Sequence, residues 1–340
     1  MAYERSGWSV LAAYVIGSSA LYNWRRNWEM RPMLAAVASR SLCDCPRSPA
    51  ELASSGLSDF DFGSAPIRLM APSPKLRVSR RLYAYTVHER SLPARSFFRL
   101  SEAVCIASPE LCLVQSANAF SSARLLELVM ELCGKYSLVP EASRGFVSHE
   151  FQLTSQSAIR AFLQEAAGMR GADKLARMLR YAQDGSRSPM ETREYLLLCL
   201  PKRYGGYGLP KPTLNYRVDL YLNERQVSQR RYFECDMCWP HQKVVVEYDG
   251  HDDHESRVDR SRDAVKRNLL IARGYVVFTV TGGQIGKVSA FERTAYDIAA
   301  ALGYRMRAFP DDWKVRHAAL REELFKSIVG YEKSGRFTDA

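Results

Sequence analysis

Two short segments of the chain carry carboxylates at a spacing that could serve metal-assisted chemistry. Residues 233–239 and 244–249 read FECDMCW and VVVEYD, and both alternate apolar and polar side chains as half-buried strands do. The alternation puts Asp236 on the polar face of the first strand and both Glu247 and Asp249 on one face of the second. We therefore expect all three acids to point the same way.

The four residues between these segments, 240–243, predict a hairpin that pairs Trp239 with Val244, and hence Asp236 with Glu247. Directly opposed residues lie roughly 4.5 to 5.5 Å apart at Cβ, where like charges are unfavourable unless something neutralises them. Mg²⁺ or Mn²⁺ would do so with Asp236 and Glu247 as ligands, and would leave room for a substrate phosphate. The chemistry indicated is metal-assisted phosphodiester hydrolysis.

The ordinary alternative places these acids on the solvated face of an amphipathic hairpin. Two features oppose it. Glu247 ends a Val-Val-Val run typical of a buried central strand, where an unpaired charge is costly. Gly250, directly after Asp249, permits a sharp turn or a close approach of the backbone to a ligand.

The elements around this hairpin follow from periodicity and from residues that start and stop helices. Ser188 can cap a helix whose first position is Pro189. Gly274 is expected to end a long helix, and Gly282 and Gly283 the strand after it. We expect a mixed β-sheet flanked by helices, in the α/β (α+β) class. The predicted elements are helices at 189–200, 255–273 and 288–302, a Gly- and Pro-rich connection at 204–212, and strands near 218–222, 232–239, 243–248 and 275–281.

The chain before this region shows two kinds of pattern. Short strand-like runs occupy 67–121, best seen at 82–87 and 104–107, and helical periodicity follows at 122–133 and 156–180. The predicted domains are an N-terminal segment without assignable chemistry at 1–65, a smaller α+β module with a helical spacer at 66–184, the domain of the carboxylates at 185–305 and a C-terminal helix at 306–340.

The composition of the chain indicates which binding partners and which cellular compartment to expect. The chain has 340 residues, 46% of them hydrophobic, which suffices for two domains with real cores. Its net charge of +11 favours a polyanionic partner such as nucleic acid, although an ordinary basic surface is the alternative. Ser18, Ser19 and Asn23 interrupt the first apolar run before the ~18 residues that a bilayer requires. We expect no membrane partner, a cytoplasmic protein and reduced thiols at the eight scattered cysteines.

The stretch from Glu234 to Thr281 resembles the endonuclease-like domains related to very-short-patch mismatch repair endonucleases, which belong to the PD-(D/E)XK superfamily. That family has an acid on its first strand, E-x-D-G on the second, a nearby His, D-x-x-R on the next helix, G-Y before the last core strand and a Glu on its opening helix. The resemblance implies a restriction-endonuclease-like fold and a Mg²⁺-dependent DNA endonuclease. The matching residues are Asp236, Glu247 to Gly250, His251 or His254, Asp259 to Arg262, Gly274 with Tyr275, and Glu191 in SPMETREYLLL.

The same resemblance implies that Asp236 and Glu247 hold the metal while Asp249 and Glu191 support the metal or the water. One position departs from the pattern, because Asp249 stands where the superfamily usually has a lysine. The group that orients or deprotonates water must then come from elsewhere, with His254 as the first candidate and Lys266 as the second. For Asp263 and Lys266 we favour an exposed, salt-bridged helix face. For the histidines of HDDH, a loop role beside the site is favoured over metal ligation.

Basic side chains near the predicted site are expected to bind backbone phosphates. A zinc site that joins Cys235 and Cys238 to Cys43 and Cys45 is an alternative use of this region, but strand alternation puts Cys235 and Cys238 on opposite faces. The predicted phosphate-binding residues are Arg230, Arg231, Arg262 and Lys266, with Lys202 and Arg203 beside them.

Residues 81–133 are similar to the domain that follows the winged helix in abortive-infection-type antitoxins, with His88 and Pro93 as the better matches. Arg77, Arg80 and Arg81 could contact phosphates there, although solvated arginines are the ordinary explanation. Such domains accompany mobile-element and phage-defence systems, which suggests that setting by analogy.

The leading hypothesis is therefore a DNA endonuclease. The alternative from another class is a DNA-binding regulator, or antitoxin-like protein, on a nuclease fold. Intact carboxylates oppose that alternative, because a binding platform gains by losing negative charge near phosphate. RNA stays open as a substrate, since a 2′-hydroxyl reader is recognised only from the geometry of a site.

Overall fold

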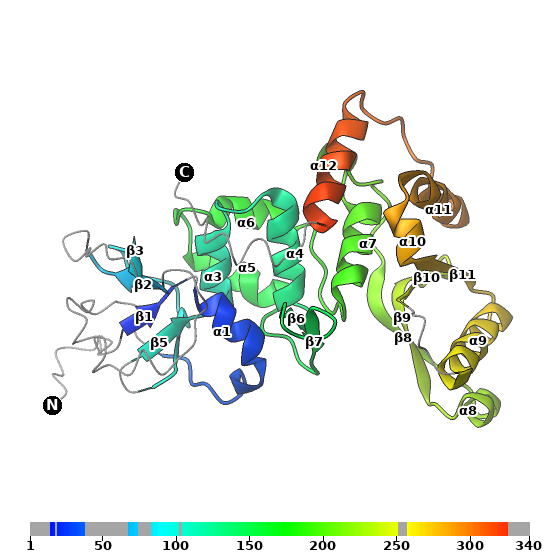
Figure 1. Ribbon diagram of the computed structural model, residues 1–340, viewed down its shortest axis with the longest axis horizontal. Coiled ribbons are helices and arrows are strands. Elements are labelled where there is room, and N and C mark those ends of the chain that lie inside the picture. The colour runs from blue at the N-terminus through cyan, green and yellow to red at the C-terminus, as the bar shows by residue number, and fades with distance from the viewer. Residues whose placement is uncertain are drawn as a thin grey trace. The chain divides into compact units, whose positions relative to one another are not determined.

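The computed structural model describes residues 14–17, 19–37, 67–73, 83–101, 104–250 and 257–325. The chain divides into two compact units, residues 1–182 with 326–340 and residues 183–325 (Figure 1). Within the described residues, no helix is both long and apolar enough to cross a membrane. Some residues singled out in the sequence lie outside the described ones: Cys43, Cys45, Arg77, Arg80, Arg81, His251 and His254.

The first unit contains a five-stranded sheet in the order β3-β2-β1-β5-β4 and a separate β6–β7 hairpin (Figure 1). The strands predicted at 82–87 and 104–107 and the helix at 122–133 are confirmed as β3, β5 and α4. The strands are β1 (Tyr14–Ile16), β2 (Ile67–Ala71), β3 (Tyr83–Val87), β4 (Phe97–Arg99), β5 (Val104–Ala107), β6 (Tyr136–Leu138) and β7 (Phe146–Ser148), and the helices α1 (Ala20–Arg26), η1 (Trp28–Met30), α3 (Pro109–Ser116), α4 (Ser122–Leu132), α5 (Gln156–Glu165) and α6 (Ala172–Leu179).

Two expectations for this unit need correction. Residues 109–116 form helix α3 instead of continuing the strand pattern, because Ser108 Oγ caps the helix by accepting from Leu111 N at 3.1 Å. The helical region at 156–180 is two helices, α5 and α6. Gly171 separates them at φ +100°, and a Cβ there would lie 2.2 Å from Val114 O.

The two residues that carry the antitoxin resemblance lie in structural positions. His88 follows β3, and its Nε2 is 3.2 Å from Gln115 Nε2; burial lowers its pKa. Pro93 is buried, and its carbonyl accepts from Ser96 Oγ at 2.7 Å. Both contacts position the backbone around β3 and β4.

The second unit is built on a four-stranded mixed sheet in the order β11-β10-β9-β8, in which β10 and β11 run parallel and the other neighbours antiparallel. The mixed α+β class is as predicted. The strands are β8 (Thr213–Asp219), β9 (Tyr232–Trp239), β10 (Val244–Asp249) and β11 (Val276–Thr281), and the helices α7 (Pro189–Cys199), η4 (Lys202–Tyr204), α8 (Leu222–Ser228), α9 (Arg257–Ala272), α10 (Gly282–Gly286), α11 (Val288–Ala301) and α12 (Trp313–Phe325).

The hairpin register is confirmed where the ladder is formed. Trp239 pairs with Val244, and pairing continues to Met237 with Val246. Beyond that point Tyr248 N donates to the side chain of Asp236 at 2.8 Å, and the ladder does not extend to a pair between Asp236 and Glu247. The Val run is fully buried in β10, which lies between β9 and β11 as a central strand.

Three elements differ from the sequence-based expectation. The strand expected near 218–222 is β8, which begins at Thr213 and ends at Asp219. Helix α8, which was not predicted, follows it and is anchored by Arg273 Nε, which donates to Glu224 Oε1 at 2.9 Å. Strand β11 ends at Thr281, as expected from Gly282 and Gly283, but these two glycines also start the unpredicted helix α10, because Thr281 caps that helix with Gln284.

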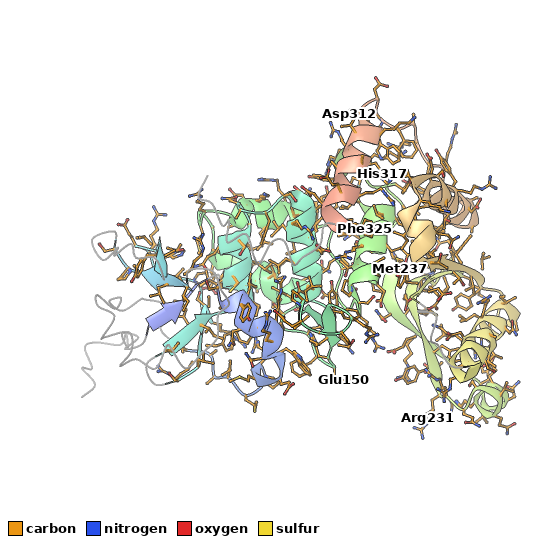
Figure 2. The ribbon with its side chains drawn as sticks, viewed as in Figure 1. Glu150, Arg231, Met237, Asp312, His317 and Phe325 are labelled. Carbon is orange, nitrogen blue, oxygen red and sulfur yellow. The ribbon has the colours of Figure 1, made fainter. Side chains whose placement is uncertain are left out.

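Helix α12 joins the second unit through an aromatic cluster. The Trp313 ring stacks on His317 with centroids 4.6 Å apart, and Phe309 lies 4.3 Å from the same ring. Trp313 Nε1 also donates to Gly206 O at 3.0 Å, and Tyr207 lies 5.3 Å away. Figure 2 shows His317 on α12, and the cluster fixes this helix against the segment around η4.

We expect Trp313→Ala to lower the free energy of unfolding by about 4 kcal/mol, because it removes a buried ring and leaves a cavity. Urea denaturation followed by far-UV circular dichroism measures the loss. Val315→Ala on the same helix is the control, since Val315 is 73% exposed and a surface change of this kind costs under ~0.5 kcal/mol. Equal losses in both variants would contradict an anchoring role for the cluster.

Candidate active site

Helix α7 carries two acidic side chains one turn apart. Ser188 Oγ accepts from Glu191 N at 3.1 Å and Pro189 occupies the first helical position, which confirms the predicted helix start. Glu191 is 7% exposed and Glu194 is fully buried. Because residues three apart share one side of a helix, both carboxylates leave α7 on the same side.

The backbone of β10 holds the carboxylate of Asp236. Asp236 Oδ2 accepts the hydrogen bond from Tyr248 N. Burial raises the pKa of Asp236, while Lys266, the Tyr248 amide and Arg187 act in the opposite direction. Arg187 itself donates to both carboxylate oxygens of Glu234, at 2.5 and 2.9 Å. Asp236 is thus held in a half-buried position, with Lys266 and Arg187 close enough to act on its charge.

Glu247 of β10 lies beside Lys266 of α9. Lys266 Nζ donates to Glu247 Oε2 at 2.7 Å, whereas the buried Oε1 has no hydrogen-bond partner. Burial, and then the charge of Asp236, raise the pKa of Glu247 to about 7, against the effect of Lys266. Burial opposes the charged form of Lys266, but Glu247 and Asp236 outweigh it and raise the pKa of that ammonium group. The exposed face favoured for Lys266 is therefore wrong.

Glu191 is held by the residues around it. Its Oε2 accepts from Arg187 N at 3.0 Å and from Asn215 Nδ2 at 3.2 Å. Burial, followed by the charge of Asp236, raises the pKa of Glu191 to about 7, and the two donors offset part of that rise. Asn215 adopts φ +48°, a left-handed conformation in which its amide also reaches Gly185 O at 2.9 Å.

Glu194 belongs to the same group of acids, and sequence reasoning missed it. Both of its carboxylate oxygens are buried without a hydrogen-bond partner. Burial, then Asp236, Glu191 and Glu247, raise its pKa well above the ordinary value. A signal was present, because Glu194 lies three residues after Glu191 on the predicted helix, but the Leu run that follows made this face look like plain core.

Replacing Glu194 by Met should raise the free energy of unfolding by about 2 kcal/mol when EDTA is present, because it removes a buried polar group without partners. Thermal denaturation in EDTA measures the change. Glu323→Met on α12 serves as a control for helix propensity at an acidic position. A destabilised Glu194→Met variant would show that Glu194 has a stabilising partner in the folded protein.

Of the four acids described above, Glu247 lines a cavity of about 340 Å³ between β10, β11 and α9. Glu247, Asp249 and Gly250 line it from β10 and the turn after it, and Lys266 and Arg267 from α9. The structure thus places the predicted Glu247, Asp249 and Lys266 around one space with room for a small anionic group. A basic side chain from α9, Arg267, was not singled out in the sequence.

The predicted phosphate-binding residues fall into three groups. Arg230 and Arg262 line a second cavity of about 250 Å³, which shares Asp263 and Lys266 with the first. Arg231 is exposed and directly precedes β9, far from Met237 near the other end of that strand (Figure 2). Lys202 is engaged elsewhere, because its ammonium contacts the carbonyls of Arg307 and Ala308 and lies 3.7 Å from the centre of the Phe309 ring. These contacts occupy the ammonium group of Lys202 and hold it against the segment before α12.

The cysteines of β9 do not obey simple alternation. Cys235 and Cys238 are free thiols, both fully buried in one core cluster with Val218, Val245 and Leu270. The prediction that they face opposite sides is wrong, since both side chains pack into this one cluster. Cys43 and Cys45 lie outside the described residues.

Within the part of the chain that the structure describes, no three His, Cys, Asp or Glu side chains form a ready-made metal-ligand cluster. His254 and the side chain of Asp259 are outside that part. Comparison of the chain with protein-family models, with curated proteins and with solved structures found no match.

Proposed function

We propose that residues 183–325 form a metal-dependent nuclease that hydrolyses phosphodiester bonds in DNA. The observation that carries this proposal is the gathering of two buried acids, Glu191 and Glu194, with two half-buried ones, Asp236 and Glu247, in mutual electrostatic contact. Lys266 is hydrogen-bonded to Glu247. Burying several acids together is unfavourable for stability alone, and such arrangements are typical of functional sites.

The order of the elements supports a restriction-endonuclease-like core related to very-short-patch repair endonucleases. A helix bearing Glu191 precedes three antiparallel strands, of which β9 carries Asp236 and β10 carries Glu247 and Asp249. Helix α9 and the parallel strand β11 follow, with Gly274 between them at φ +80°. This order agrees with the sequence pattern on which the resemblance rests.

The donor atoms suit Mg²⁺ or Mn²⁺. Among the acids of this site, Glu247 Oε1 and both carboxylate oxygens of Glu194 are buried without hydrogen-bond partners, and buried oxygens normally have partners. Hard cations take oxygen ligands, and Mg²⁺ usually uses one or two carboxylates together with waters and a substrate phosphate. Asp236 and Glu247 are the ligands that we assign, with Glu191 and Asp249 as supporting acids.

When bound, the ion would polarise the scissile phosphate and make a bound water more acidic. The chain's own residues position the reactants. Lys266 holds Glu247 in a fixed orientation through Oε2 and presents a positive charge to the cavity, where the superfamily's lysine is otherwise missing. Arg267 lines the same cavity and would attract the negatively charged backbone. The three valines of β10 are fully buried, so water does not reach this part of the strand.

The test is cleavage of supercoiled plasmid, labelled single-stranded DNA and labelled RNA by the full chain, each with Mg²⁺, Mn²⁺ or EDTA. We expect DNA to be cut with either metal and left intact in EDTA. If the chain cuts RNA and leaves DNA intact, the proposed activity becomes that of a ribonuclease. Salt-sensitive DNA binding without any cutting would favour the DNA-binding regulator, in which the acids have no catalytic use.

A further inference from the structure

The second cavity has a chemical character different from that of the first. It lies between α8, the start of β9 and α9. Its apolar lining comes from Val227, Phe233 and Val265, and its basic lining includes Arg230 and Arg262. An apolar surface bordered by guanidinium groups is suited to a flat, weakly polar ring that is joined to an anion.

Helix α8 contributes Val227 to this lining, although that side chain does not hold the helix in place. Glu224 is its buried residue, and it is held by Arg273, whose Nη1 also donates to Asp219 O at 2.7 Å. Val227, in contrast, is 66% exposed. An ionic anchor therefore leaves an apolar side chain facing the cavity, where a ligand can cover it.

The position of the cavity indicates which ligand that is. Asp263 and Lys266 line both cavities, so the second cavity is a neighbour of the one that Glu247 and Asp249 line. Arg230 is exposed and forms no ion pair within the described residues. A polyanionic strand whose phosphate lies beside Glu247 would carry its next nucleotides along α9 toward this arginine.

We propose that the cavity between α8 and α9 binds an unpaired nucleotide of the substrate strand beside the cleavage site. The base packs against Val227 and Phe233, and Arg230 and Arg262 bind the adjoining phosphate. The inference rests on the proposed nuclease function, and it adds a preference: a paired base in a duplex is stacked and cannot offer its face to Val227, whereas an unpaired or extruded base can.

Fluorescence anisotropy of labelled single-stranded and duplex DNA in EDTA tests this binding without cleavage. Val227→Ser should weaken binding of the single strand by about five-fold, the loss expected from one apolar contact, and should leave duplex binding and the salt dependence unchanged. Arg230→Ala should reduce the slope of log affinity against log salt by about 0.7 for the single strand. Both side chains are exposed, so both variants should keep the fold.

Arg305→Ala is the matched control, because Arg305 is exposed in the same unit and lines neither cavity. Arg305→Ala should change neither the affinity for the single strand nor the salt slope by as much as the two test variants do. Equal losses on single strand and duplex, unchanged affinity in Val227→Ser and Arg230→Ala, or no DNA binding by the unmodified chain would each overturn the proposal.

The outcome is separable from that of the nuclease proposal. Metal-dependent cutting together with unaffected binding in both variants would refute the nucleotide cavity and leave the nuclease intact. Selective loss of single-strand binding in a chain that never cuts would support the cavity and refute catalysis.

Discussion

Asp236→Asn is expected to reduce metal-dependent DNA cleavage by on the order of 10³-fold, comparable with the loss of one preorganised electrostatic group in other enzymes. The Asn side chain keeps an oxygen that can accept from Tyr248 N, so the hydrogen bond to β10 survives while the negative charge is lost. Initial rates of plasmid nicking in Mg²⁺ measure the effect, and circular dichroism verifies the fold.

The control for this substitution is Asp311→Asn, which removes an exposed carboxylate outside both cavities. Its cleavage rate should match that of the unmodified chain. A Mg²⁺-induced rise in melting temperature gives a second readout, because a ligand that binds only the folded state stabilises it. The ligand role of Asp236 would be refuted by an Asp236→Asn variant that retains both the rate and this rise.

Lys266→Met should lower the free energy of unfolding in EDTA by about 3 kcal/mol, because it leaves the buried carboxylate of Glu247 without its partner. Both side chains of the pair are about one-fifth exposed or less, so solvent screens the interaction only in part. The same change should slow cleavage by about 10²-fold, as expected when a positioned group is lost. Urea denaturation and plasmid nicking measure the two effects.

The double variant Lys266→Met/Glu247→Gln separates a charge effect from a packing effect. Removing both charges should restore most of the lost stability and none of the cleavage, since the cost of the single change comes from the unpaired carboxylate. Lys314→Met, at an exposed position of α12, controls for the exchange of Lys for Met. A single variant as stable as the unmodified chain would mean that Glu247 needs no cation nearby.

Local features of the site could be predicted from the sequence. The register of Trp239 with Val244 follows from a short connection between two alternating segments, and the helix start at Ser188 from a cap followed by proline. Both depend on residues close together in the chain. The central position of the Val run in β10 was also predicted, because a strand buried on both faces needs apolar residues throughout.

Features that depend on distant contacts could not be predicted. Lys266 reads as part of an exposed face until β10 is known to lie under it. Glu194 looks like part of a core helix because the pattern does not show which charges its face meets. Helix α8 shows no apolar stripe, since an ion pair between Glu224 and Arg273, far apart in sequence, holds it in place. The cysteines of β9 were misplaced because strand alternation does not show which core cluster each side chain joins.

The distribution of the site over the chain has a consequence for folding. Asp236 and Glu247 lie in one hairpin, which closes a short loop at little entropic cost. Glu191 lies on α7, which precedes the hairpin, and Lys266 on α9, which follows it, so both must dock as separate helices. A partly synthesised chain would hold two acids together without the helix α9 that supplies their cation. Under the proposed function, competence for hydrolysis would then come only when α9 docks.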